Sequence, residues 1–229
     1  MQSHRALAGS RRSFLQASAA AALCASVCEV AWIGPALAQS TLSPDAALQR
    51  LLDGNKRYVE QHGEAYRDDL TGLRHKTEAR QEPFAGILAC ADSRVPVEIL
   101  FDQSIGQLFV ARVAGNIASP EIIASLEYGA AVLGTPVIMV LGHSHCGAVH
   151  AAMDGEAVPG QISVLFAALR PAIDQSGHDL EAAVKANARI QGGILRGASP
   201  VLAGLVKTGE LKIVAASYDL ASGKVELLT

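Results

Sequence analysis

Residues 136–147 read Pro-Val-Ile-Met-Val-Leu-Gly-His-Ser-His-Cys-Gly, and they give the clearest indication of the fold class. Residues 136–141 form an unbroken apolar run, which is typical of a strand buried on both faces of a parallel sheet. His143 and Cys146, two residue types that bind metals, follow directly after this run. The stretch therefore predicts a buried strand that ends at a chemically reactive loop.

Similar apolar runs occur on both sides of this stretch, at residues 84–89, 107–113 and 212–216. Helical patterns lie between these runs, at residues 120–133, 160–173 and 179–195. Alternating strands and helices predict an α/β fold with a Rossmann-like, mostly parallel sheet, right-handed crossovers and flanking helices. After the last of these strands, a turn at 221–224 is expected to lead into a short edge strand.

The segment before the first strand is polar. Ser43 and Pro44 supply a cap and a first-turn proline, so we expect an amphipathic helix from there to about residue 62. Residues 63–82 are charged and predict a loop, with a short helix near 72–79.

Composition narrows the classes of function. The chain has 229 residues, of which 50% are hydrophobic and 18% are charged, so it can bury the core of one domain. Intrinsic disorder is excluded by this composition. The formal net charge is -3 and only 4% of residues are aromatic, so neither a phosphate-binding patch nor a base-stacking platform is expected. We predict no nucleic-acid partner.

Residues 1–38 have the order of an export signal: basic residues, a small apolar run and a small-residue cleavage motif. Arg11 and Arg12 begin a stretch that resembles a twin-arginine signal, with Gln16 where the usual pattern has Lys. Residues 36–38, Ala-Leu-Ala, form the cleavage motif. We therefore expect a signal peptide over 1–38 and a periplasmic or otherwise exported protein.

An ordinary amphipathic N-terminal helix and an uncleaved membrane anchor are the alternatives. Glu29 interrupts the apolar run, and charge is costly at membrane depth, so we expect no stable membrane anchor. Removal of residues 1–38 leaves a single domain over 39–229.

That domain keeps two of the four cysteines, Cys90 and Cys146. Two cysteines in an exported protein suggest a disulfide. Twin-arginine export, however, carries folded proteins, so a metal inserted in the cytoplasm could already hold both thiolates. We expect metal binding rather than a disulfide.

Reactive residues cluster where the first and third predicted strands end. Cys90, Asp92 and Arg94 follow the first strand, and His143 and Cys146 follow the third. Ligand sites of parallel sheets lie beyond the carboxyl ends of strands, so both clusters can face one crevice. Two thiolates, an imidazole and a carboxylate form a set that Zn2+ prefers. Taken singly, each of these residues also fits a purely structural role, as an inert core cysteine, a helix cap or a solvated side chain.

The sequence resembles the β-carbonic anhydrases over roughly residues 44–228. The motifs that carry the resemblance are Cys90-Ala91-Asp92-Ser93-Arg94, Gly142-His143-Ser144-His145-Cys146-Gly147, Arg112-Val113-Ala114-Gly115-Asn116, Glu127-Tyr128-Gly129 and Gln81-Glu82-Pro83. The resemblance implies one catalytic domain over 39–229 and zinc held by Cys90, His143 and Cys146. It also implies a homodimer or higher even oligomer, with the helix at 44–62 wrapped around the partner subunit.

The reaction implied is the reversible hydration of carbon dioxide to bicarbonate. Asp92 and Arg94 match the family's dyad, in which the arginine holds the carboxylate off the metal, and Gln81 matches its substrate-side glutamine. In a closed, inactive form Asp92 would itself bind zinc. Alternatives are a hydrolase of carbon disulfide or carbonyl sulfide on the same fold, and a non-catalytic zinc-binding protein.

Three further positions in or near these motifs, Ile87, His145 and His150, bear on inhibition and proton transfer. Ile87 stands where the bicarbonate-inhibited subgroup has Trp, so we do not expect its inhibitory site, although Arg112 and Tyr128 match the other two members. His145 lies between two predicted ligands and either relays protons or only packs. His150 is expected on a helix surface.

Overall fold

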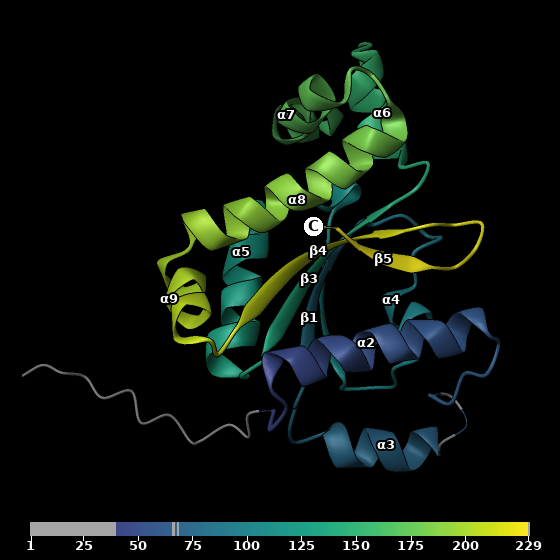
Figure 1. Cartoon of the computed structure of the whole chain (residues 1–229), viewed down its shortest axis with the longest axis vertical. Helices are drawn as coiled ribbons and strands as arrows, with labels where there is room; N and C mark the ends of the chain where they lie inside the picture. Colours follow the sequence, from purple (N-terminus) through teal and green to yellow (C-terminus); the bar gives the residue numbers. More distant parts are fainter. Residues whose placement is uncertain (1–39, 66, 68, 229) are drawn as a thin grey trace, which may run out of the picture. The chain divides into compact units, whose positions relative to one another are not determined.

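The computed structural model describes residues 40–65, 67 and 69–228. A five-stranded sheet with the order β2-β1-β3-β4-β5 runs through them (Figure 1). The first four strands are parallel and β5 is antiparallel to β4, as the mostly parallel prediction requires. The strands are β1 Ala85–Ala89, β2 Leu108–Arg112, β3 Val137–His143, β4 Lys212–Tyr218 and β5 Val225–Leu228.

Helices cover both faces of this sheet. The α-helices are α2 Pro44–Val59, α3 Leu70–Thr77, α4 Val97–Leu100, α5 Pro120–Glu127, α6 Gly147–Asp154, α7 Phe166–Ser176, α8 Leu180–Ala198 and α9 Pro200–Thr208. Short helices of other types are η1 Ala114–Asn116, η2 Tyr128–Val132 and η3 Ile162–Leu165. None of the helices in the described part of the chain has both the length and the apolar character needed to cross a membrane.

The alternation of side chains along β3 explains why its apolar run is unbroken. Met139 and Leu141 belong to the core on the side of α2 and α4. Ile138 and Val140 belong to the core on the side of α5, α8 and α9. Successive side chains of a strand point to opposite faces, so a strand between two helical layers needs apolar residues at every position. All seven residues of β3 are buried.

The helix predicted at 44–62 is α2, and it begins as expected. The Ser43 hydroxyl accepts a hydrogen bond from the Ala46 N–H, and Pro44 occupies the first turn. Its apolar face, however, packs on its own sheet: Ala47 and Leu51 are fully buried there. The chain's own β-sheet therefore covers these two residues, and contact of the helix with a partner subunit stays a prediction.

A buried amide fixes the same helix. Asn55 Nδ2 donates to the carbonyls of Leu100 (3.2 Å) and Gly223 (2.9 Å), and its Oδ1 accepts from the Val225 N–H at 2.9 Å. One side chain thus ties α2 to α4, the final turn and β5.

The sequence patterns missed several details. Helices α4, α6 and α9 were not predicted as separate elements, and the predicted helix at 120–133 continues beyond α5 as the π-helix η2. β3 extends two residues past the predicted run, so His143 is its last residue. The predicted short helix near 72–79 is α3, and the predicted edge strand is β5. The proposed signal peptide lies outside the described residues.

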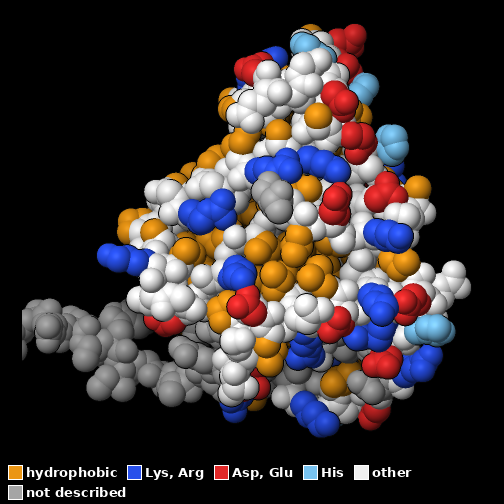
Figure 2. Space-filling view, in the orientation of Figure 1, with side chains coloured by type: hydrophobic (Ala, Val, Ile, Leu, Met, Phe, Trp, Pro, Cys, Tyr) orange, Lys and Arg blue, Asp and Glu red, His pale blue; other side chains and the backbone are white. Residues whose placement is uncertain are grey.

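One surface remains partly apolar. Figure 2 shows hydrophobic side chains gathered over β4 and β5, between α8 and α2, with basic side chains around them. Leu48, Val214 and Leu227 line a pocket of about 540 Å³ in this region. Leu227 on the edge strand is 38% exposed.

Candidate metal centre

The carboxyl ends of β1 and β3 bring three predicted ligands together. Cys90 follows β1, His143 ends β3, and Cys146 immediately precedes α6. The potential ligand atoms of these residues all lie within 4.8 Å of one another, and all three residues are buried. Both cysteines are free, with their Sγ atoms 4.0 Å apart. The two thiols and the imidazole thus converge without a disulfide, as the sequence predicted.

The orientation of His143 leaves one ring nitrogen available. Its Nδ1 lies 3.0 Å from the carbonyl oxygen of Ser144. A carbonyl oxygen can only accept, so Nδ1 carries the proton and Nε2 presents a lone pair. Nε2 is buried and has no hydrogen-bond partner. A buried, unpaired nitrogen beside two thiols fits a bound zinc ion, which would satisfy all three ligands.

The surroundings of the thiols favour loss of a proton. The hydrogen bond from Cys146 lowers the pKa of Cys90 to about 4; burial opposes this change, and His143 and the Gly115 N–H support it. The Gly115 N–H lies 3.3 Å from Cys90 Sγ. The pKa of Cys146 is raised, mainly because Cys146 shares its proton with Cys90. A divalent cation would replace this shared proton and stabilise both thiolates.

Gly115 can make this contact because of its backbone. Its φ is +75°, in the left-handed region where a side chain is strained, and an added Cβ would lie 3.1 Å from Leu169. The Arg112-Val113-Ala114-Gly115-Asn116 motif therefore contributes a donor to the metal centre.

Asp92 and Arg94 form the dyad that the sequence predicted. Arg94 Nε donates to Asp92 Oδ1 at 3.0 Å, and Arg94 Nη2 donates to Oδ2 at 2.7 Å. These hydrogen bonds hold the pKa of the Asp92 carboxyl well below its usual range. Asp92 Oδ2 also lies 3.9 Å from His143 Nε2. The carboxylate is therefore beside the ligand cluster, ionised and fastened to the arginine.

Arg112 ties down the loop that carries two of these residues. Its Nε donates to the Cys90 carbonyl at 2.9 Å and its Nη2 donates to the Asp92 carbonyl at 2.6 Å. Ile87 is fully buried in the core of β1, and Tyr128 is 44% exposed, with its ring 6.2 Å from that of Phe109. Arg112 thus supports the metal-binding loop through backbone carbonyls.

Gln81 is not brought to this centre within one chain. It is exposed and lies ahead of β1, whereas Cys90 follows the far end of that strand. Five strand residues span about 16 Å at roughly 3.3 Å per residue. Gln81 therefore lies toward the opposite end of the sheet from its own chain's Cys90.

His145 and His150, the other histidines of the loop and of α6, have exposed side chains. The side chain of His145 is 75% exposed, so it does not pack within this chain. His150 lies on α6, and its Nδ1 is 3.1 Å from Asp154, as expected for a residue on a helix surface.

Sequence reasoning missed Glu181, whose Oε1 accepts the His145 N–H at 2.9 Å. No local signal marks Glu181, because it reaches this loop from a distant helix.

Comparison with known proteins agrees with this geometry. The family model described as carbonic anhydrase matches residues 85–225. Carbonic anhydrase 2 of Mycobacterium tuberculosis is 35% identical over 196 residues, which cover 81% of this chain and 93% of the relative. A carbonic anhydrase of Pseudomonas aeruginosa is 36% identical over 165 residues, which cover 65% of this chain and 74% of the relative.

Solved structures give the same result. A Coccomyxa β-carbonic anhydrase in complex with acetazolamide is 27% identical with a TM-score of 0.63, and the match covers 79% of this chain and 86% of that one. A tetrameric β-carbonic anhydrase of Sordaria macrospora matches with a TM-score of 0.63 at 21% identity, over 69% of this chain and 90% of that one. The fold, the Cys90–His143–Cys146 cluster and these relatives together show that the chain belongs to the carbonic anhydrase family, in its β class.

Proposed function

We propose that this centre hydrates carbon dioxide reversibly to bicarbonate and a proton, with zinc held by Cys90, His143 and Cys146. The observation that carries this proposal is the unpaired, buried His143 Nε2, which lies between two free thiols and beside an ionised carboxylate. Zinc bound there supplies Lewis acidity toward a water molecule.

The Asp92 carboxylate orients the attacking water. Because Arg94 holds it ionised, it accepts a hydrogen bond from the water and stabilises the developing hydroxide character. The same two hydrogen bonds would keep the Asp92 carboxylate bound to Arg94 rather than to zinc. Release of this clamp would let Asp92 bind zinc and close the site. A protein that only stored zinc would need neither group.

Gln81 acts, in this proposal, from a second copy of the chain. Its exposed position toward the other end of its own sheet leaves it free to reach a neighbouring subunit's centre. An even-numbered assembly would then complete each site, in agreement with the tetrameric Sordaria macrospora relative. Mixed oligomers test this idea: Gln81→Ala subunits combined with Cys146→Ser subunits should show more activity than the average of the two parents, because one intact site would form between unlike subunits. Activity no higher than that average would count against a shared site.

Export is proposed from the sequence of residues 1–38. Trp32 is the single tryptophan of the chain and precedes the cleavage motif, so a processed protein should show no tryptophan emission. Arg11→Lys combined with Arg12→Lys should retain the protein in the cytoplasm, folded and zinc-loaded. Normal export of that double variant would contradict the twin-arginine assignment and leave the zinc site unaffected.

The activity itself is tested with a pH-indicator assay of carbon dioxide hydration on the purified protein, with carbon disulfide as the alternative substrate. We expect about one zinc per chain, rapid hydration and no turnover of carbon disulfide. Preferential hydrolysis of carbon disulfide would assign the site to the alternative reaction. Full zinc occupancy without either activity would indicate a binding protein.

A further inference from the structure

The two residues between His143 and Cys146 must turn the chain sharply so that both side chains reach the same metal. The turn is made at His145, whose φ is +54°. This left-handed region is one that residues other than glycine rarely adopt without support. Because the His145 side chain is 75% exposed, packing does not supply that support.

Hydrogen bonds to the backbone supply it instead. The His145 N–H donates to Glu181 Oε1 at 2.9 Å, and the His145 carbonyl accepts from Arg94 Nη2 at 3.1 Å. The preceding residue is also held, since the Ser144 N–H donates to the Tyr218 carbonyl at 2.9 Å. The peptide groups on both sides of the strained residue are thus fixed by other segments of the fold.

Glu181 is well placed to act as such a support. It lies in the first turn of α8, two residues after the N-cap Asp179, whose side chain accepts the Ala182 N–H at 2.9 Å. Ala183 and Val184 of the same turn are buried in the hydrophobic cluster that contains both metal-binding cysteines. The helix start is therefore anchored against the metal centre, and the carboxylate reaches the loop from a fixed base.

We propose that Glu181 is a positioning residue for the zinc site: it holds the left-handed peptide of His145 so that His143 and Cys146 converge on one ion. This inference rests on the proposed zinc centre and adds a residue that does not touch the metal. Because Arg94 binds both Asp92 and the His145 carbonyl, movement of the loop would also disturb the dyad.

Zinc release from the holoprotein to a chelating dye measures this role without any assay of carbon dioxide hydration. Glu181→Ala should release zinc about tenfold faster, the factor expected for loss of one hydrogen bond to a charged group. Glu181→Gln retains an acceptor oxygen and should release zinc at close to the wild-type rate. Unchanged release from Glu181→Ala would overturn the proposal.

Asp179→Ala is the matched control for helix stability. It removes the N-cap of α8 two residues away and leaves the Glu181 hydrogen bond in place. We expect a lower melting temperature and an unchanged rate of zinc release. If this variant released zinc as fast as Glu181→Ala, the effect would come from fraying of the helix, and the positioning role would be wrong.

Substitutions at His145 test whether Glu181 acts through the backbone. Glycine adopts positive φ without strain, so in a His145→Gly background the change Glu181→Ala should accelerate release less than about twofold. His145→Ala removes the imidazole but keeps the strain, so the full acceleration should remain. Equal acceleration in both backgrounds would contradict the backbone mechanism. Failure of carbon dioxide hydration with these zinc results intact would refute only the proposed reaction.

Discussion

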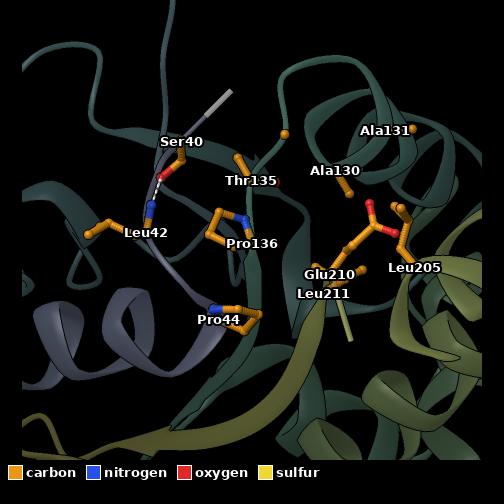
Figure 3. Close-up of a pocket in the computed structure, with 11 residues that line it drawn as sticks. Ser40, Leu42, Pro44, Ala130, Ala131, Thr135, Pro136, Leu205, Glu210 and Leu211 are labelled. Carbon is orange, nitrogen blue, oxygen red and sulfur yellow. Dashed lines mark hydrogen bonds between the residues drawn. The ribbon is translucent and has the colours of Figure 1, made fainter. Parts of the chain in front are cut away.

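The two ends of the β-sheet each contain a buried polar atom without a hydrogen-bond partner, but only one of them forms a metal site. At the carboxyl end one such atom is His143 Nε2, with the thiols of Cys90 and Cys146 close by. At the amino end one such atom is Thr135 Oγ1, in a pocket of about 270 Å³ that also contains Glu210 and Ser40 (Figure 3). An isolated polar atom is therefore insufficient, and the difference lies in how many ligands the topology brings together.

Parallel strands explain this difference. Their carboxyl ends all lie at the same edge of the sheet, so the loops that follow β1 and β3 meet there. The amino-end pocket is lined mainly by apolar side chains such as Leu42, Pro136 and Leu205. Its two hydroxyls, from Ser40 and Thr135, and its single carboxylate, from Glu210, do not make a soft ligand set for zinc.

The largest expected effect is loss of the metal. Cys146→Ser should remove zinc and lower activity by more than about 100-fold, because a hydroxyl is a poor substitute for a thiolate ligand. Thr135→Val is the matched control, since it removes an unpaired buried polar atom at the amino end, and zinc content and activity should not change. Elemental analysis and the hydration assay measure both. Nearly full zinc in Cys146→Ser would refute the ligand assignment.

The next effect separates catalysis from metal binding at the same end of the sheet. Asp92→Asn should keep zinc but lower kcat by about 100-fold, because the amide lacks the charge that stabilises the developing hydroxide. Arg94→Ala should have a similar effect by freeing Asp92 to bind zinc. Zinc analysis and the hydration assay are compared for each protein. Normal turnover in both variants would remove the dyad from the mechanism.

A substitution in α2 should affect stability rather than the metal centre. Leu51 is fully buried against the sheet, so Leu51→Ala should lower the free energy of unfolding by about 2–5 kcal/mol. Urea unfolding measures this change, and the folded variant should still bind one zinc per chain. Val164→Ala, at a side chain that is 67% exposed, is the control and should change stability by less than about 0.5 kcal/mol. An equally small effect at Leu51 would indicate that α2 does not pack on this sheet.

The smallest expected effect is a pH dependence at Asp102. Burial raises the pKa of this carboxyl, but the Ala65 N–H, Arg57 and the Glu64 N–H together lower it below its ordinary value. A lowered pKa stabilises the fold above the unfolded-state value of about 3.9, and this stabilisation is lost as pH falls through the folded-state value.

Asp102→Asn should therefore destabilise the protein near pH 7 and differ less from the wild type near pH 3. Urea midpoints at the two pH values measure the difference, and Asp174→Asn on the exposed side of α7 is the control. A difference that stayed constant across this range would show that the charge of Asp102 contributes nothing.

The layered fold and the set of metal ligands could be predicted from local patterns of residues. Apolar runs such as 136–141 specify strands buried on both faces, because a local pattern of side chains decides whether a segment can lie between two helical layers. Cys90, His143 and Cys146 were identifiable because each lies at or within three residues of such a strand's end.

The support of this ligand set, and the distance of Gln81 from it, depend on contacts between segments that are distant in the sequence. Glu181 lies 36 residues from His145, and Arg112 lies 22 residues from Cys90, yet each hydrogen-bonds to the backbone there. The packing of α2 on its own sheet and the separation of Gln81 from Cys90 are likewise properties of the folded chain. Side-chain patterns report local conformation, whereas these contacts depend on which loops and helix ends meet once the strands have paired.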